Sequence, residues 1–112
     1  MSLSPQATRL KKIQVLRDEQ KVQEDLIFKK DFEVKDMKSD LDYLENELQD
    51  SADEMVSDAM EGESTDSDYD NFKSNAEDYQ QIKEDLKELN SEFEQLQVGL
   101  ENIKKKLKRL KK

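Results

Sequence analysis

The sequence predicts an all-α fold: an antiparallel two-helix coiled-coil hairpin that completes a larger helical bundle with a partner or by self-association. The composition is 42% charged and 33% hydrophobic, with two glycines and one proline, which is typical of long helices. Apolar residues recur at alternating spacings of three and four, the heptad pattern of coiled coils. A segment rich in Ser, Asp and Glu separates two such periodic regions. We therefore expect a single helical hairpin over residues 1–112.

The predicted first helix covers residues 5–49, and its pattern also allows it to continue to residue 60. Ser4 is its expected start, with Pro5 in the first turn, where the missing backbone N–H of proline does no harm. Its heptad register is apolar from Val34 to Leu48 and mostly polar from Gln20 to Lys30. The seam positions are Ile13, Leu16, Gln20, Gln23, Ile27, Lys30, Val34, Met37, Leu41, Leu44, Leu48 and Met55.

The predicted second helix covers residues 69–111 and carries the more regular seam, which is interrupted only at Asn75. An apolar stripe of two positions in seven is narrower than the face that a helix shows to a globular core. We therefore expect other helices to pack against this stripe along its length. One heptad position holds Phe72, Tyr79, Leu86, Phe93, Leu100 and Leu107, and the other holds Ile82, Leu89, Leu96, Ile103 and Leu110. The predicted partner-binding residues on it are Leu86, Leu89, Phe93, Leu96, Leu100 and Ile103.

The predicted acidic turn covers residues 50–68, with pairing of the helices centred near residue 59. This centre places the apolar seam from Leu86 to Leu107 opposite residues 10–32, where seam positions are polar. A polar seam residue forfeits the ~1.5–3 kcal/mol that a buried Leu or Ile contributes, and it must find a partner or reach water. The second helix therefore has more apolar surface than the first can cover, which predicts additional helices.

Phe28 and Phe32 lie one helical turn apart and away from the seam. Two interpretations are open. In the first, they fold over the flank of the hairpin, or the register slips here. In the second, they form a docking spot for a partner protein, and we include them among the predicted partner-binding residues.

The charges are distributed unevenly along the chain. Between Ser39 and Phe72 there are thirteen acidic residues and no Lys or Arg, whereas seven of the last nine residues are basic. In a hairpin this gives an acidic tip and a basic end. Basic residues at a helix C-terminus also complement the helix dipole. The net charge of −9 and the lack of interleaved aromatic residues argue against nucleic-acid binding.

One stretch matches the ligand spacing of a calcium-binding EF-hand loop. Five oxygen-bearing residues occupy ligand positions of that loop, namely Asp66, Asp68, Asp70, Ser74 and Glu77. The glycine of the loop is replaced by Asn71, and Lys73 stands where an apolar residue is usual. The alternative interpretation is a solvated acidic turn that caps the second helix.

No other motif indicates chemistry. The chain has no histidine, cysteine or tryptophan and no glycine-rich phosphate loop, so we predict no enzyme activity, no catalytic residue, no cofactor and no further metal site. It has no apolar run long enough to span a membrane, and its first residues lack the basic-then-apolar pattern of a cleaved export signal, so we expect neither a membrane span nor such a signal. We expect a cytoplasmic protein that could be exported together with a partner.

Two short elements carry a resemblance to a known group of proteins. Phe32-Glu-Val-Lys-Asp36 resembles the FxxxD element, and Tyr43-Leu-Glu-Asn-Glu47 the YxxxD/E export element, of the small WXG-like and LXG-toxin-associated helical partners of type VII secretion. The chain has no Trp-x-Gly turn, and both elements fall within the first helix. The resemblance implies a non-enzymatic adaptor or chaperone that binds a toxin's helices. The alternative function is a structural coiled-coil scaffold or tether that homo-oligomerises.

Overall fold

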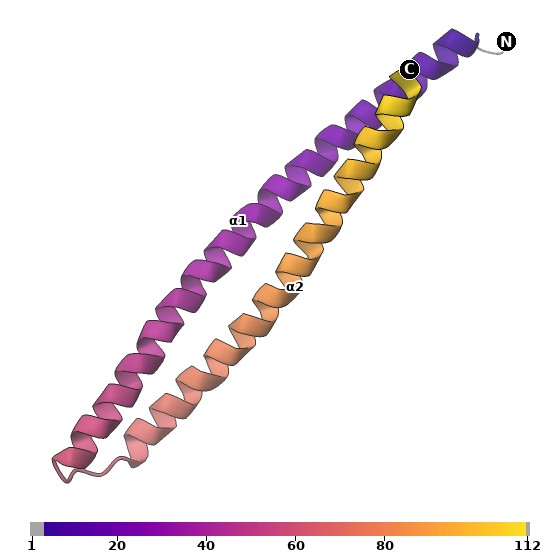
Figure 1. Cartoon of the computed structure of the whole chain (residues 1–112). Coiled ribbons are helices and arrows are strands. Elements are labelled where there is room, and N and C mark those ends of the chain that lie inside the picture. Colours follow the sequence, from indigo (N-terminus) through magenta and orange to yellow (C-terminus); the bar gives the residue numbers. More distant parts are fainter. Residues whose placement is uncertain (1–3, 112) are drawn as a thin grey trace. The chain divides into compact units, whose positions relative to one another are not determined.

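The computed structural model describes residues 4–111, which form two helices and contain no strand. Helix α1 spans Pro5–Met60 and helix α2 spans Asp66–Lys111. A short turn joins them, and the chain reverses direction there (Figure 1). The predicted all-α helical hairpin is confirmed.

Helix α1 begins where the sequence predicts. The backbone N–H of Thr8 donates to the carbonyl of Ser4 at 2.9 Å, and the N–H of Ala7 donates to the Ser4 hydroxyl at 3.1 Å. Ser4 is therefore the N-cap, and it satisfies an N–H group that has no partner within the helix. Pro5 occupies the first helical position.

Helix α1 ends at Met60, at the longer of the two predicted limits. The N–H of Glu63 donates to the carbonyl of Asp58 at 2.9 Å, and the N–H of Gly62 donates to that of Ala59 at 3.2 Å. With Gly62 at φ 79°, these two bonds form a Schellman motif. The acidic composition after Asp50 does not end the helix, because only Gly62 supplies the left-handed conformation that this cap requires.

Helix α2 begins at Asp66, so the turn comprises residues 61–65 and the predicted turn over 50–68 is too long. The N–H of Tyr69 donates to the carbonyl of Thr65 at 2.8 Å, which makes Thr65 the N-cap. Asp66 and Asp68 lie in the first turn, where negative charge stabilises the positive end of the helix dipole. The predicted start at residue 69 is therefore one turn late.

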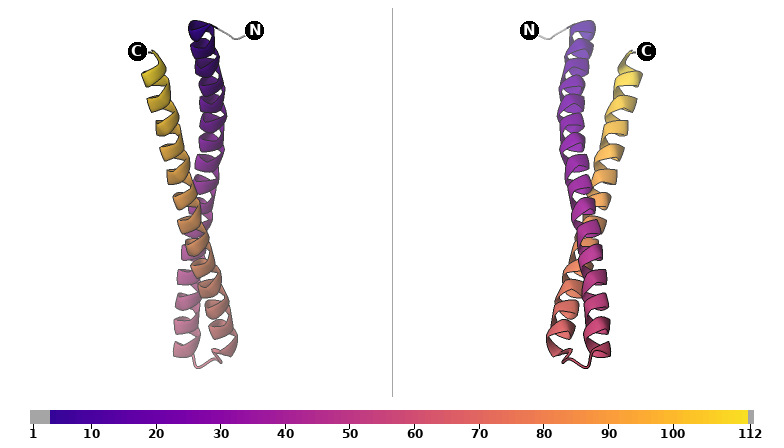
Figure 2. Two further views of the ribbon diagram at one scale, coloured as in Figure 1. Left: turned by 90° about the vertical axis from the view of Figure 1, so that its right-hand side faces the viewer. Right: turned by 90° about the vertical axis from the view of Figure 1, so that its left-hand side faces the viewer.

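The described chain divides into two compact units. Unit 1 contains residues 4–32 and 90–111, and unit 2 contains residues 33–89. In each unit a segment of α1 runs antiparallel to a segment of α2 (Figures 1 and 2). Unit 2 also contains the turn.

The predicted heptad register describes burial in both units. Every heptad seam position of the two helices named in the sequence analysis is buried or half-buried, in contrast to most of the positions between them. No described side chain is completely buried, and even Leu107, with the lowest value, remains 5% exposed. Two helices thus shield the seam without enclosing it.

The pairing in unit 2 is centred on Glu63 rather than near residue 59. The amide of Asn75 donates to the Ser51 hydroxyl at 2.6 Å, and these two residues are equally distant from Glu63 in the sequence. The predicted centre is wrong because α1 continues to Met60, which moves the point of reversal by about one helical turn.

Candidate protein-binding surface

The six predicted contact residues of α2 lie on its seam. Leu86 and Leu89 belong to unit 2, and the other four, Phe93, Leu96, Leu100 and Ile103, belong to unit 1. Leu86 is buried and the rest are half-buried. These side chains therefore already pack within the hairpin, and a partner could reach only their exposed edges.

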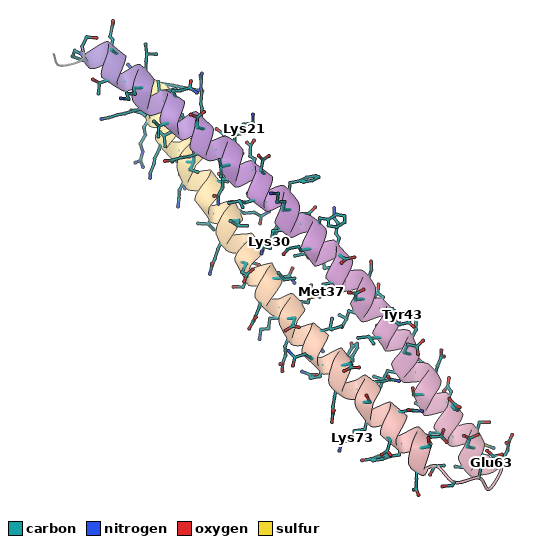
Figure 3. The ribbon with its side chains drawn as sticks, turned by 180° about the vertical axis from the view of Figure 1, so that it is seen from behind. Lys21, Lys30, Met37, Tyr43, Glu63 and Lys73 are labelled. Atoms are coloured by element: carbon teal, nitrogen blue, oxygen red, sulfur yellow. The ribbon has the colours of Figure 1, made fainter. Side chains whose placement is uncertain are left out.

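Two of the three polar seam residues of unit 1, Gln23 and Lys30, find partners on α2, whereas the amide of Gln20 donates to Glu24 of its own helix. The amide of Gln23 donates to the carbonyl of Leu96 at 2.9 Å, and the ammonium of Lys30 lies 2.8 Å from a carboxylate oxygen of Glu92. Gly99 makes room for the first contact, because a Cβ there would lie 2.8 Å from the Gln23 amide nitrogen. Figure 3 shows Lys30 on the side of α1 that faces α2. Polar groups thus replace apolar packing across this part of unit 1.

A groove opens along one flank of unit 1. Its volume is about 740 Å³, and a second groove of about 470 Å³ shares Val15 with it. The first groove is lined by Thr8, Lys11, Lys12, Val15, Leu16, Lys106, Arg109 and Leu110. The second is lined by Val15, Asp18, Glu19, Val22, Gln23 and Ile103. Apolar side chains from both helices thus form a floor that two Lys residues of α1 and two basic residues of α2 surround.

Sequence reasoning missed this flank. Val15 and Val22 are exposed and stand seven residues apart, so they occupy the same heptad position one residue before the seam. That spacing outside the seam was the available signal. It indicates an apolar stripe that the hairpin itself does not cover.

Phe28 and Phe32 are 75% and 68% exposed. They therefore do not fold over the flank of the hairpin, which was one of the two interpretations. Their register does not slip either, because Ile27 and Lys30 beside them are half-buried as the seam requires. Contact of the two rings with a partner stays a prediction.

The residues of the predicted calcium loop lie in the first turns of α2, so they do not form a loop. Successive helical side chains point about 100° apart, and they cannot converge on one ion as the ligands of an EF-hand do. Asp68 alone joins a carboxylate cluster, with Glu54 and Asp58 of α1. The predicted EF-hand geometry is therefore wrong.

Asp68 is an unusual carboxylate within that cluster. It is only 9% exposed, and its Oδ2 has no hydrogen-bond partner. A hydrogen bond with the Asp58 side chain, burial and the negative charges of Asp58, Glu54 and Glu63 raise its pKa to about 6. The raised pKa of Asp68 thus reflects first the interaction with the Asp58 side chain, then burial, then the surrounding negative charges, and these together favour a proton or a cation at this position.

Within residues 4–111, neither helix has the length of apolar sequence that crossing a membrane requires. Comparison of the chain with protein-family models, with curated proteins and with solved structures finds no match.

Proposed function

We propose that this chain is a non-enzymatic helical adaptor that binds the helices of another protein. The observation that carries the proposal is the incomplete burial of its seam, since no described side chain is completely enclosed by the two helices. Full burial of a Leu or Ile contributes ~1.5–3 kcal/mol, so a third or fourth helix on this seam gains free energy that the hairpin alone leaves unused.

The grooved flank of unit 1 suggests the chemistry of the partner. An apolar floor containing Val15 and Leu16 fits the apolar face of an amphipathic helix. The basic side chains around it, which include Lys12, Lys106 and Arg109, favour acidic residues beside that face. The expected partner segment is therefore an amphipathic helix with acidic flanks.

Exposure of the two resemblance elements is consistent with a targeting role for a secreted toxin. Phe32 and Tyr43, the first residues of the two elements, are both exposed on α1. Figure 3 labels Tyr43 on this helix. On this proposal the chain accompanies its partner from the cytoplasm to export, and the two aromatic side chains are recognised directly.

A self-associating scaffold is the second candidate, and the charges of the units favour it. In the full sequence, unit 1 (residues 1–32 and 90–112) has 14 Lys and Arg against 8 Asp and Glu, a net charge of +6. Unit 2 has 5 basic against 20 acidic residues, a net charge of −15. Opposite charges attract unit 1 of one copy to unit 2 of another.

The first experiment is the mass of the purified protein in solution, measured by light scattering after size exclusion over a concentration series. If the chain is an adaptor, the measured mass should be that of a monomer, or it should be broadly distributed and change with protein concentration. A single sharp dimer or tetramer would instead favour the scaffold.

A peptide-binding experiment then tests the adaptor surface. The probe is a synthetic amphipathic helix with leucine at its seam and glutamate beside it, and the control peptide has lysine in place of glutamate. The acidic peptide should bind, and the double variant Val15→Glu, Val22→Glu should weaken binding at least tenfold. Val98→Glu, on an exposed face of α2, is the matched control. Equal binding of both peptides would contradict the proposed surface.

A further inference from the structure

The heptad register brings two acidic side chains together at the end of the seam in unit 2. Asp58 stands seven residues after Ser51, and Asp68 stands seven residues before Asn75. Since Ser51 and Asn75 are hydrogen-bonded across the two helices, the same register places Asp58 opposite Asp68. Carboxylates thus occupy facing positions where a coiled coil ordinarily has apolar residues.

This arrangement lacks a compensating charge from its own part of the sequence. No Lys or Arg occurs between Ser39 and Phe72, which includes both acids and the turn between them. Asp68 is nine-tenths buried and its Oδ2 lacks a partner, so water cannot fully solvate its charge. The charge of this cluster can therefore be offset by a proton or by a cation from solution.

We propose that Glu54, Asp58 and Asp68 bind one divalent cation, calcium, that ties the last turns of α1 to the first turn of α2. One carboxylate oxygen from each residue lies within 4.8 Å of the others. Calcium binds oxygen ligands at about 2.3–2.6 Å, so ligands on opposite sides of the ion are about 4.6–5.2 Å apart. The three oxygens can therefore surround one ion with small side-chain adjustments.

Further carboxylates are available around the same position. Asp58 also belongs to a second close group, with Glu61 and Glu63 of the turn. Calcium takes six to eight oxygen ligands in flexible geometry, whereas magnesium requires a near-ideal octahedron and usually retains several waters. A site with three to five carboxylates on two helices and an exposed turn suits calcium better.

Calorimetric titration of the metal-free full chain with calcium chloride tests the proposal, at ~0.15 M salt to screen diffuse attraction. We expect one ion per chain with a dissociation constant on the order of 10⁻⁴ M. Two-dimensional NMR should show saturable shifts that are largest at the amides near Glu54, Asp58 and Asp68. Magnesium chloride at the same concentrations should bind at least tenfold more weakly.

The variant Asp68→Asn should weaken calcium binding at least tenfold. Asp70→Asn is the matched control, because Asp70 is exposed, lies outside the cluster and carries the same charge. Glu54→Gln, which removes an exposed ligand, provides a second loss that does not depend on a buried residue. Circular dichroism without metal verifies that each variant is helical.

Three results would overturn the assignment. Equal loss in Asp68→Asn and Asp70→Asn would indicate a diffuse response to net charge. NMR shifts that increase linearly with the calcium concentration at all acidic residues would also indicate a diffuse response to net charge. Equal affinity for magnesium and calcium would show that the site is not a calcium site. None of these results bears on the adaptor function, which is proposed from the seam and from the groove of unit 1 and not from this carboxylate cluster.

Discussion

Units 1 and 2 follow the same heptad register, but different interactions lower the stability of each unit. In unit 1 the α2 side of the seam is apolar, while Gln20, Gln23 and Lys30 interrupt the α1 side. In unit 2 the seam is apolar on both helices over its middle part, yet the net charge is −15 against +6 for unit 1. Unit 1 is therefore limited by missing apolar burial, and unit 2 by repulsion among its carboxylates.

Regular heptad spacing alone is therefore not sufficient to determine the stability of each unit. The same register places an apolar pair at one point, a Gln–backbone contact at a second and two facing aspartates at a third. Packing, hydrogen bonding and charge then determine the local stability of each helical turn. Perturbations aimed at each of these three factors should therefore affect the two units differently.

The largest expected effect comes from placing a charge on the seam of each unit. Leu96→Asp in unit 1 and Leu89→Asp in unit 2 should each cost ~2–4 kcal/mol, because they remove apolar packing and place a carboxylate on a half-buried position. Leu89→Asp should cost more, since it adds to the excess negative charge of unit 2. Thermal unfolding followed by circular dichroism measures both, and hydrogen exchange assigns the loss to a unit.

Leu89→Asp and Leu96→Asp combined in one chain should also abolish association with helical partners. Val98→Asp, which places the same charge on an exposed position of α2, is the control and should change the stability by less than ~0.5 kcal/mol. Unfolding temperatures that are the same for the control and for both seam variants would contradict the role of the seam.

The register could be predicted because it depends only on spacing, and burial at Val34, Leu86 and Leu107 follows it. The turn could not be placed by composition. The acidic residues after Asp50 remain helical because helix termination depends on a local cap, here the Schellman bonds at Gly62. Once Gly62 is taken as the cap, the pairing register follows by counting from the turn.

The second largest effect should come from salt. Each exposed like-charge contact costs only tenths of a kcal/mol, but unit 2 contains an excess of fifteen acidic residues. Raising sodium chloride from ~0.05 to ~0.5 M shortens the screening length and should stabilise unit 2 by ~1–2 kcal/mol. Hydrogen exchange should slow for amides of 33–89 and change little for unit 1. Uniform slowing in both units would contradict the charge difference.

A smaller gain is expected from restoring the seam of unit 1. Gln23→Leu replaces a half-buried amide with an apolar side chain that packs beside Leu96, and it should stabilise unit 1 by ~1 kcal/mol. The lost hydrogen bond matters little, because the Leu96 carbonyl lies within α2. Gln97→Leu, at an exposed position of α2, is the control and should have no such effect. A lower unfolding temperature for Gln23→Leu would show that the hydrogen bond of the Gln23 amide contributes more to stability than the apolar packing of a leucine at this position.

The candidate sites were predictable only in part. Asp68 was identified from its spacing among acidic residues, but its actual neighbours Glu54 and Asp58 come from the other helix. Spacing along one segment cannot reveal a contact that depends on the pairing register. The basic end of the hairpin was predicted, but the groove around Val15 was missed, because Val15 and Val22 lie outside the seam positions and were not recognised as a second apolar stripe.

The smallest expected effect concerns the ion pair of unit 1. Lys30 and Glu92 are 22% and 55% exposed at their side chains, so water and salt screen an attraction across 2.8 Å. A double-mutant cycle with Lys30→Met and Glu92→Gln should give a coupling of ~0.5 kcal/mol that falls as salt rises. Lys30→Met alone should be neutral or stabilising, because the methionine adds apolar burial at a half-buried seam position. A coupling above ~1.5 kcal/mol would mean that charge pairing, rather than missing burial, determines the stability of unit 1.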